Sequence, residues 1–395
     1  MKNAQTLIEL FKAQTTSPLE EEIVLDGDLD FSDTSLVYPL GASSDTSCVA
    51  YSGVFRGNGY SIKGLKMNNA DDNKYRKAGL FCGVKDATVE NLVIDSTCFF
   101  SGTSAGALSV TLLGSLTLKN VTNKANVEGN NEVGGFIGSV KGLKQEARMS
   151  FGGCVNSGFI NGTGYYAGGF VGYISNNNNI TITISDSTSV GNVISNGNNI
   201  GGFVGFIDSN SNVVLVISNS TNNNTVNGTT NVGGFVGYIL QSKNMIMTVF
   251  NSTNNGAVIG GEDVGGFVGV INCKSTSNSV KIISSANKAS VTSERGIACG
   301  LFCVDTSRNN GVKTTVLNSI NRGTVNGNTS SFGITNNITM AKSVVSIGDV
   351  TCSSDDCFSF TFWNAKIDAG LLFAKNGKCT YCSVDAKLIE FNQIT

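Results

Sequence analysis

The chain has 395 residues, of which 48 are Gly, 11 are Cys and none is His. Without His, the Ser-His-Asp and Cys-His nucleophiles, His-ligated zinc or haem, and imidazole acid–base catalysis are all excluded. Charged residues make up only 14% and the formal net charge is -2, so a groove that neutralises many nucleic-acid phosphates is excluded as well. The longest apolar run, Val213 to Ile217, has five residues, far fewer than the roughly 20 of a membrane-spanning helix.

The first element that the sequence predicts is a short helix between residues 3 and 14. Leu7, Ile8, Leu10 and Phe11 recur at near-helical spacing, and Asn3 is a suitable N-cap. A helix here would cover the unpaired strand edge at which a stacked β-structure begins. We therefore expect an N-terminal cap.

Two charged segments follow the predicted helix. Asp26, Asp28 and Asp30 alternate, so they share one strand face and could hold a hard cation, but the segment lacks the Gly and terminal Glu of an EF-hand loop. A solvated edge or turn is favoured over a calcium site, and we predict no metal and no cofactor. The second segment could serve a lyase-like site, although a solvated loop is favoured; it contains Asp71, Asp72, Lys74, Arg76 and Lys77.

Three residue series recur through the middle of the chain with a period near 33. A Gly-Gly-Phe-Val-Gly element is centred on Phe136, Phe170, Phe203, Phe235 and Phe267, at spacings of 34, 33, 32 and 32. Weaker copies surround Phe81, Leu108, Phe302 and Phe332. An aliphatic series comprises Val127, Ile160, Val193, Val226, Val258, Val291 and Val325. Four residues before each of these stand Asn123, Asn156, Ser189, Asn222, Asn254, Asn287 and Asn321.

The residue types in each repeat favour strands over helices. Ankyrin and tetratricopeptide arrays have similar periods, but these units are rich in Val, Ile, Phe and Thr, and Ile180 to Ile184 alternate with the two-residue period of a strand. The leucine-rich pattern is absent too. We predict an all-β, right-handed parallel β-helix of about ten to twelve coils with about three short strands per coil, a rod of roughly 50 to 60 Å.

Stacking of equivalent positions predicts the role of each series. The five Phe residues should fill an inner core together with the residues four positions on, which are Val140, Ile174, Ile207, Ile239 and Ile271. The Asn residues should form hydrogen-bonded ladders in turns. The glycines should permit close packing; a phosphate-binding Gly loop would need a following helix and usually a Lys, and the sequence offers neither.

These motifs resemble the GLUG-motif repeats of secreted and surface proteins, which include adhesin-like proteins and the repeat regions of some IgA-peptidase-type proteins. The order of Leu25 to Asp30, Phe55 to Leu65, Gly79 to Phe81 and Val89 to Leu92 is similar to the start of such solenoids. The resemblance covers about residues 5 to 335 and departs from the motif at Cys82, Cys303 and Val304. It implies a solenoid that serves display and adhesion rather than one shared reaction.

One candidate binding surface emerges from strand parity. If the Phe series faces inward, the opposite parity faces outward and forms an apolar stripe. The stripe consists of Ile137, Val171, Val204, Val236 and Val268, and then of Ser139, Tyr173, Phe206, Tyr238 and Val270. Tyr173, Phe206 and Tyr238 could stack on sugar rings, and they are the candidate binding residues. The alternative, that a long loop of each coil covers the stripe, is somewhat favoured.

Catalytic constellations are scarce in the sequence. Asp186 and Asp208 are the only carboxylates between Phe151 and Phe250, and they fall at different phases of the repeat, so no paired-carboxylate glycosidase site is predicted there. No catalytic residue is therefore assigned. An ice-binding array is disfavoured because Thr181 and Thr183 lack Thr counterparts beside Val213 to Ile217 or Met245 to Val249.

The cysteines and glycosylation sequons bear on the compartment. Four cysteines near the end of the chain could form disulfides in an oxidising compartment, remain as buried thiols, or bind zinc, and disulfides are favoured. They are Cys352, Cys357, Cys379 and Cys382. Seven further cysteines make the total odd, so at least one thiol is free or pairs between chains. Nine sequons permit N-glycosylation, at Asn120, Asn161, Asn179, Asn219, Asn223, Asn227, Asn251, Asn328 and Asn337. Met1 precedes no apolar signal region, which indicates either a mature fragment or a protein outside the secretory route.

The whole sequence predicts one solenoid domain. Residues 1–48 are the cap and first strands, 49–345 the repeat coils, and 346–395 the Cys-bearing terminal coils and a second cap that contains Phe358, Phe360, Phe362 and Trp363. We predict a non-enzymatic structural or adhesive protein, extracellular or on a cell surface, with cytoplasmic assembly as the alternative location. Its expected partners are other copies of itself, through end-to-end or lateral assembly, or surface glycans and proteins. The alternative function is a β-helix carbohydrate enzyme, either a lyase or a hydrolase.

Overall fold

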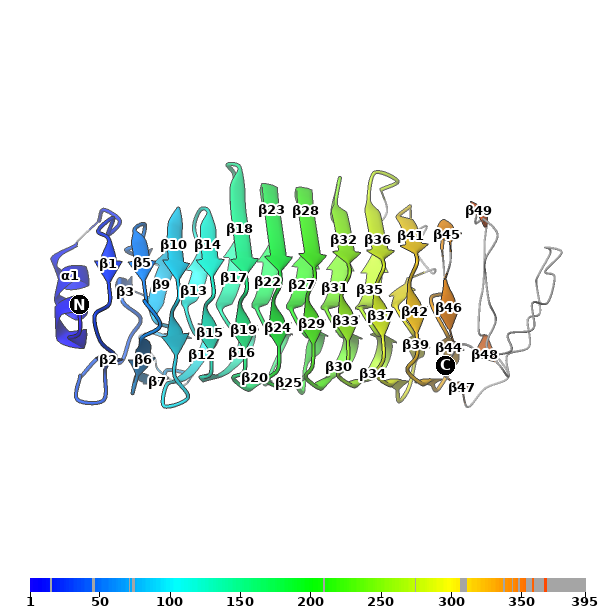
Figure 1. The fold of residues 1–395 in the computed structure, drawn as a ribbon, viewed down its shortest axis with the longest axis horizontal. Helices are drawn as coiled ribbons and strands as arrows, with labels where there is room; N and C mark the ends of the chain where they lie inside the picture. Colours follow the sequence, from blue (N-terminus) through cyan, green and yellow to red (C-terminus); the bar gives the residue numbers. More distant parts are fainter. Residues whose placement is uncertain are drawn as a thin grey trace.

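The computed structural model describes residues 1–352, with gaps at 15, 45–46, 71, 73–74, 209, 274, 306–310, 337, 343 and 347–348, together with short strands at 357–358 and 366–367. The described residues form a rod of stacked turns that begins at helix α1 (Ala4–Ala13) (Figure 1). Within the described residues, four sheets run along the rod, and their strands pair in parallel. The predicted parallel β-solenoid is confirmed, but a turn contributes strands to four sheets rather than to three.

Two of the sheets, B and C, follow one another along each turn. Sheet B has 12 strands: β1 (Ile23–Val24), β5 (Val54–Arg56), β10 (Ala87–Glu90), β14 (Leu116–Lys119), β18 (Ala147–Gly152), β23 (Asn178–Ser185), β28 (Ser211–Ser218), β32 (Ile246–Phe250), β36 (Ser279–Ile283), β41 (Lys313–Leu317), β45 (Met340–Lys342) and β49 (Lys366–Ile367). Sheet C has 11 strands: β2 (Leu29–Asp30), β6 (Ser61–Lys63), β11 (Val93–Ile94), β15 (Thr122–Asn123), β19 (Val155–Asn156), β24 (Thr188–Ser189), β29 (Thr221–Asn222), β33 (Thr253–Asn254), β37 (Ala286–Asn287), β42 (Ile320–Asn321) and β46 (Val345–Ser346).

Sheets E and A complete the turn. Sheet E has 16 strands: β7 (Lys66–Asn68), β8 (Lys77–Ala78), β12 (Phe99–Gly106), β16 (Asn126–Gly134), β20 (Ile160–Gly162), β21 (Tyr166–Gly168), β25 (Val193–Ser195), β26 (Asn198–Gly201), β30 (Val226–Gly233), β34 (Val258–Gly265), β38 (Val291–Ser293), β39 (Ile297–Cys299), β43 (Val325–Gly327), β44 (Ser330–Phe332), β47 (Val350–Cys352) and β48 (Cys357–Phe358). Sheet A has 8 strands: β9 (Phe81–Val84), β13 (Ser109–Leu112), β17 (Ile137–Lys141), β22 (Val171–Ser175), β27 (Val204–Asp208), β31 (Val236–Leu240), β35 (Val268–Asn272) and β40 (Phe302–Val304). A separate antiparallel hairpin joins β3 (Ala42–Ser44) to β4 (Ser47–Cys48).

Helix α1 covers the N-terminal end of the rod, as predicted. Asn3 Oδ1 accepts a hydrogen bond from Gln5 N at 2.8 Å and caps the helix. The ring of Phe11 packs against that of Phe81, with 5.7 Å between centroids. The edge of β1 is covered as well, because the N-terminal ammonium donates to Val24 O at 2.5 Å and Asp26 N donates to Met1 O at 3.2 Å. This edge is therefore closed to further strand pairing.

The Phe series lies in the interior and stacks from turn to turn. Phe136, Phe170, Phe203, Phe235 and Phe267 are fully buried, and successive ring centroids lie 4.7 to 5.0 Å apart. The aliphatic residues four positions on are equally buried and belong to the same core cluster. Both predicted core rows are confirmed.

The paired glycines before each Phe are required by close packing. A Cβ on Gly233 would lie 1.9 Å from Val236 O. One on Gly234 would lie 2.2 Å from Gly266 O and 2.9 Å from the side chain of Asn254. Each of the five copies leads into a strand of sheet A rather than a helix, so the predicted packing role is confirmed.

The Asn series forms a buried ladder, as predicted, but it lies in the short strands of sheet C rather than in turns. The Nδ2 of Asn222 donates to Asn254 Oδ1, that of Asn254 to Asn287 Oδ1, and that of Asn287 to Asn321 Oδ1, each at 2.8 Å. The four side chains are fully buried. Hydrogen-bond donors and acceptors that would be costly to bury alone therefore satisfy one another along the rod axis.

Two details of register differ from the sequence prediction. In the terminal Gly-Leu-Phe copies, Phe81 pairs through Ser109 with Ile137, and Phe302 pairs with Val268. Leu80 and Leu301 therefore take the inner Phe position. The first copy has one residue fewer between Ala78 and Phe81 than its partner has between Ala105 and Ser109, whereas the second loses a residue only after Phe302, where Cys303 pairs with Val270. On sheet B, Thr183 pairs with Val216 and Val216 with Thr248, so Thr183 does have a Thr counterpart two turns on.

Candidate binding row at the corner of sheets E and A

The first half of the predicted outward stripe is wrong. Ile137, Val171, Val204, Val236 and Val268 are fully buried and belong to the main core cluster. The reason is that alternation does not hold along the whole strand: Val171 and Ile174, three positions apart on β22, both lie in the core. Between them, a Cβ on Gly172 would lie 2.6 Å from Val133 N, so sheet E packs closely against sheet A here.

The second half of the stripe forms an aromatic row outside that core. Tyr173, Phe206 and Tyr238 pair in register on β22, β27 and β31. Their rings are stacked, with centroids 5.5 Å apart between Tyr173 and Phe206 and 5.3 Å apart between Phe206 and Tyr238. Phe206 is 4% exposed, whereas the two tyrosines are half-buried. The structure therefore brings the three predicted binding residues together.

A fourth aromatic residue, Tyr166, completes the row and was missed from the sequence. It lies at the start of β21 in sheet E, and its ring stacks on Tyr173 at 4.5 Å and on Phe206 at 4.9 Å. The equivalent positions in the next turns are Asn199, Asn231 and Asp263. An aromatic residue at a position that is Asn or Asp in these next turns was the sign in the sequence that Tyr166 differs from its equivalents. Only the fold shows that sheet E faces sheet A here. We call Tyr166, Tyr173, Phe206 and Tyr238 the corner row.

One end of the corner row meets an ion pair between a buried carboxylate and an exposed lysine. Glu132 is 5% exposed, accepts a hydrogen bond from Ser104 Oγ at 2.9 Å and pairs with Lys141. The Lys141 ammonium lies 5.1 Å from the centroid of the Tyr173 ring, a cation–π arrangement. Carboxylate, ammonium and phenol therefore meet at this end.

The other end of the corner row meets amides, carboxylates and a disulfide. Asn272 Nδ2 contacts Tyr238 Oη at 3.2 Å and donates to Asp305 Oδ2 at 2.8 Å. Beyond it lies a cavity of about 180 Å³ lined by Asp263, Val270, Ile297, Cys303, Val304, Asp305 and Asn336. Burial, with smaller contributions from Glu262 and Asp305, raises the pKa of the Asp263 carboxyl to about 6.

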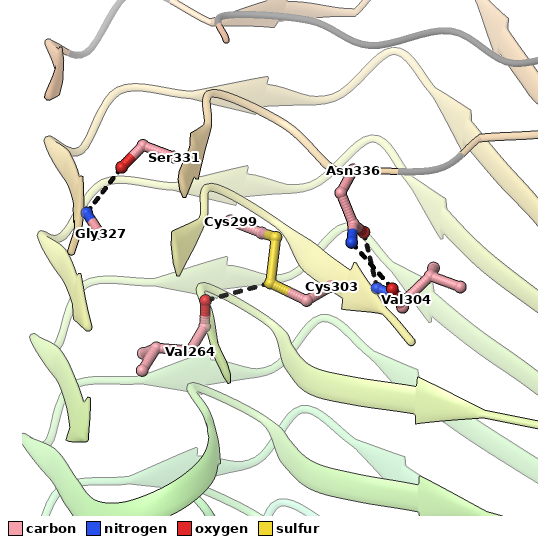
Figure 2. Close-up of a disulfide and its surroundings, with 7 residues drawn as sticks. All are labelled: Val264, Cys299, Cys303, Val304, Gly327, Ser331 and Asn336. Atoms are coloured by element: carbon pink, nitrogen blue, oxygen red, sulfur yellow. Dashed lines mark hydrogen bonds between the residues drawn. A yellow bond between two sulfur atoms is a disulfide. The ribbon is translucent and has the colours of Figure 1, made fainter. Parts of the chain in front are cut away.

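Figure 2 shows the disulfide whose Cys303 lines this cavity. Cys299 and Cys303 are bonded, with Cα atoms 5.5 Å apart, and Cys303 Sγ contacts Val264 O at 3.5 Å. Asn336 accepts from Val304 N at 2.7 Å and donates to Val304 O at 2.8 Å. Cys299 pairs with Gly265 of the preceding turn, so a side chain is accommodated at a position that is Gly in that turn. The turn that contains Cys299 is one residue shorter between Phe302 and Cys303.

The corner row offers ring edges and hydroxyl groups rather than open ring faces. Phe206 has ring neighbours on both sides, and Tyr173 has Phe206 and Lys141. Burial raises the pKa of the Tyr166 and Tyr173 phenols, which keeps both hydroxyls protonated at neutral pH. The row can therefore donate hydrogen bonds and contribute apolar ring edges.

The other predicted candidates lie apart from the row. Asp26 pairs with the N-terminal ammonium, Asp28 with Lys63, and Asp30 accepts from Ser32 N. Among the described residues no group of three His, Cys, Asp or Glu side chains is placed to hold a metal ion. Asp186 binds Asn219 at the turn between sheets B and C, whereas Asp208 ends β27 in sheet A, so they do not form a pair.

The charged segment at residues 71–77 packs partly onto the rod. Asp72 accepts hydrogen bonds from Tyr75 N at 3.0 Å and from Tyr38 Oη at 3.1 Å. Tyr75 is 2% exposed, so the segment is not wholly a solvated loop. Asp71 and Lys74 lie outside the described residues.

Disulfides and buried thiols both occur in the described part of the chain. Cys48 is bonded to Cys82 and Cys299 to Cys303, and Cys352 is also disulfide-bonded. Free thiols are buried at Cys98, Cys154 and Cys273, and burial raises the pKa of each to about 11. The Cys357 side chain, Cys379 and Cys382 lie outside the described residues, as do Phe360, Phe362 and Trp363.

The sequon asparagines that the structure describes lie on the surface of the rod. Asn337 falls outside the described residues, and none of the other eight asparagines is buried. Six are exposed, namely Asn120, Asn179, Asn219, Asn223, Asn251 and Asn328. Access for glycosylation is therefore open at these positions.

Comparison with known proteins yields limited likenesses. No family model matches the chain, and the GLUG-motif resemblance stays a prediction. A segment of 102 residues, 26% of this chain, is 28% identical to Halomucin from Haloquadratum walsbyi and spans 1% of that protein's length. Among solved structures, the chain is similar to a putative immunoglobulin A1 protease from Bacteroides ovatus, at a TM-score of 0.48 and 18% identity over 63% of this chain and 74% of that one. No helix in the described residues is long and apolar enough to cross a membrane.

Proposed function

We propose that this protein is a non-enzymatic structural or adhesive β-solenoid, extracellular or on a cell surface, and that the corner row is its rigid binding face. The observation that carries the proposal is the corner row itself: four aromatic rings, stacked across three turns and positioned by two sheets, lie outside the core. Aromatic rings held by packed sheets lose little entropy on binding. Disulfides, surface sequons and the short likeness to Halomucin support an extracellular location.

Surface glycans and proteins are the partner classes that suit such a face, because ring edges and phenol hydroxyls serve both. Lateral self-assembly remains part of the proposal. End-to-end pairing through β1 is not, since Met1 already hydrogen-bonds that edge.

A β-helix carbohydrate-active enzyme is the second candidate, and one observation favours it. Buried Glu132, Lys141 and the Tyr173 ring meet at one end of the row, and a carboxylate, an amine and a phenol are groups that acid–base catalysis can use. Lys141 and Glu132 are engaged with each other in an ion pair. For this reason we place binding first.

The experiment is a glycan array probed with the full chain and with Tyr238→Ala. Phe250→Ala is the matched control, because Phe250 is an exposed aromatic residue on sheet B, outside the corner row. Binding that Tyr238→Ala abolishes and Phe250→Ala retains supports the proposal. Release of unsaturated or reducing sugars from uronate polysaccharides, lost in Glu132→Gln, would instead establish the enzyme.

A further inference from the structure

The buried Asn ladder of sheet C is interrupted in one turn by Ser189. This residue pairs with Asn156 on one side and with Asn222 on the other. In the intact ladder the Nδ2 of each Asn donates to the Oδ1 of the Asn one turn further on, as in Asn222 to Asn254 at 2.8 Å. Ser189 has no amide to donate, and Asn222 Oδ1 is left without a hydrogen-bond partner.

The same place is marked by a second exception, Asn224. In the other turns, the position two residues after the ladder residue is a glycine or an alanine: Ala125, Gly158, Gly191, Gly256, Ala289 and Gly323. Asn224 instead reaches back one turn, and its Nδ2 donates to Ser189 Oγ at 2.6 Å. Its Oδ1, like that of Asn222, has no hydrogen-bond partner. The larger side chain at 224 thus accompanies the smaller one at 189.

The interior at this point holds two acceptor oxygens that no donor reaches, because the hydroxyl of Ser189 makes no hydrogen bond to either of them. Asn222 is fully buried and Asn224 is 1% exposed, so bulk water does not reach either amide. Buried carbonyl oxygens in folded proteins are nearly always hydrogen-bonded, to the protein or to ordered water. Both amides are neutral, so nothing here balances the charge of a buried cation. A small neutral ligand that donates two hydrogens meets the need.

We propose that the ladder break is a binding site for one internal water molecule, which donates to Asn222 Oδ1 and to Asn224 Oδ1. Internal waters make about three hydrogen bonds to polar groups of this kind and are integral to the fold. The water takes the place of the amide that the other ladder turns supply. The solenoid thereby keeps its ladder satisfied across a turn whose sequence lacks the Asn.

The test is a crystal structure of the full chain in which ordered waters are visible. A density peak within hydrogen-bonding distance of both Oδ1 atoms is expected. Three results would overturn the proposal: an empty site, a peak with the short distances and oxygen shell of a metal ion, or an Asn224 amide whose Nδ2 donates directly to Asn222 Oδ1. In the last case the ladder closes without any ligand.

A pair of variants provides a second, independent measurement. The double variant Ser189→Asn and Asn224→Gly reproduces the residues of the neighbouring turns, so it should lose the peak and melt no lower than the wild type. Ser189→Asn alone should melt lower, because its amide and that of Asn224 compete for one space. Asn223→Gly, at an exposed neighbour, is the control that should retain the peak. A peak that persists in the double variant would contradict the assignment.

Discussion

Replacing Asn254 with Ala tests the energetic role of the ladder directly. Asn254 is fully buried, accepts from Asn222 Nδ2 and donates to Asn287 Oδ1, both at 2.8 Å. Its removal leaves Asn287 Oδ1 without that donor, at about 1 to 3 kcal/mol for a buried orphan, and removes a second hydrogen bond worth about 1 kcal/mol. The vacated volume adds to the loss. We expect a total destabilisation of about 3 kcal/mol.

The measurement is equilibrium urea unfolding followed by circular dichroism. Because a repeat array can unfold in parts, hydrogen exchange in β33 and β37 should be measured alongside it and should accelerate. Asn255→Ala is the matched control. Asn255 is exposed, in the same turn, and donates to Asn223 Oδ1 at 2.9 Å, so its loss should cost less than about 0.5 kcal/mol. Equal effects of the two substitutions would refute the argument that burial makes the ladder valuable.

Three further outcomes follow from particular contacts. Gly234→Ala should prevent folding or greatly lower the melting temperature, because its Cβ would lie 2.2 Å from Gly266 O. Gly152→Ala should be tolerated, because the nearest atom to its Cβ lies 3.9 Å away. Similar melting curves for the two variants would contradict this argument. The pKa of Asp263 is raised to about 6, so between pH about 4 and about 6 the folded state binds more protons than the unfolded state. The free energy of unfolding should therefore fall as the pH rises through this range. The melting temperature of Asp263→Asn should lack that fall, and a pH profile identical to that of the wild type would contradict the raised pKa. Phe206→Ala removes three ring contacts and should cost about 3 kcal/mol in thermal unfolding; a neutral result would mean that the row is not packed in solution.

The residues themselves determined the solenoid and most of its interior. A period near 33, strand-type alternation and repeated Gly, Phe and Asn leave few other architectures, because each position stacks on its equivalents and must suit them. The core Phe row, the Asn ladder and the capping helix were all predictable for this reason. Three of the four corner-row residues were predictable too, from their parity with the Phe row.

Only the tertiary structure decided which predicted surfaces are open. Strict parity counted from Phe170 assigned Val171 and its equivalents to solvent although they are fully buried, because alternation breaks at Gly172, where sheet E packs closely against sheet A. Tyr166 joined the row because two segments of one turn meet across a corner, a contact that no spacing in the sequence encodes. The position of Phe302 was likewise decided by pairing with the preceding turn: Cys299 pairs with Gly265 and Phe302 with Val268, so Leu301 rather than Phe302 takes the position of Phe267.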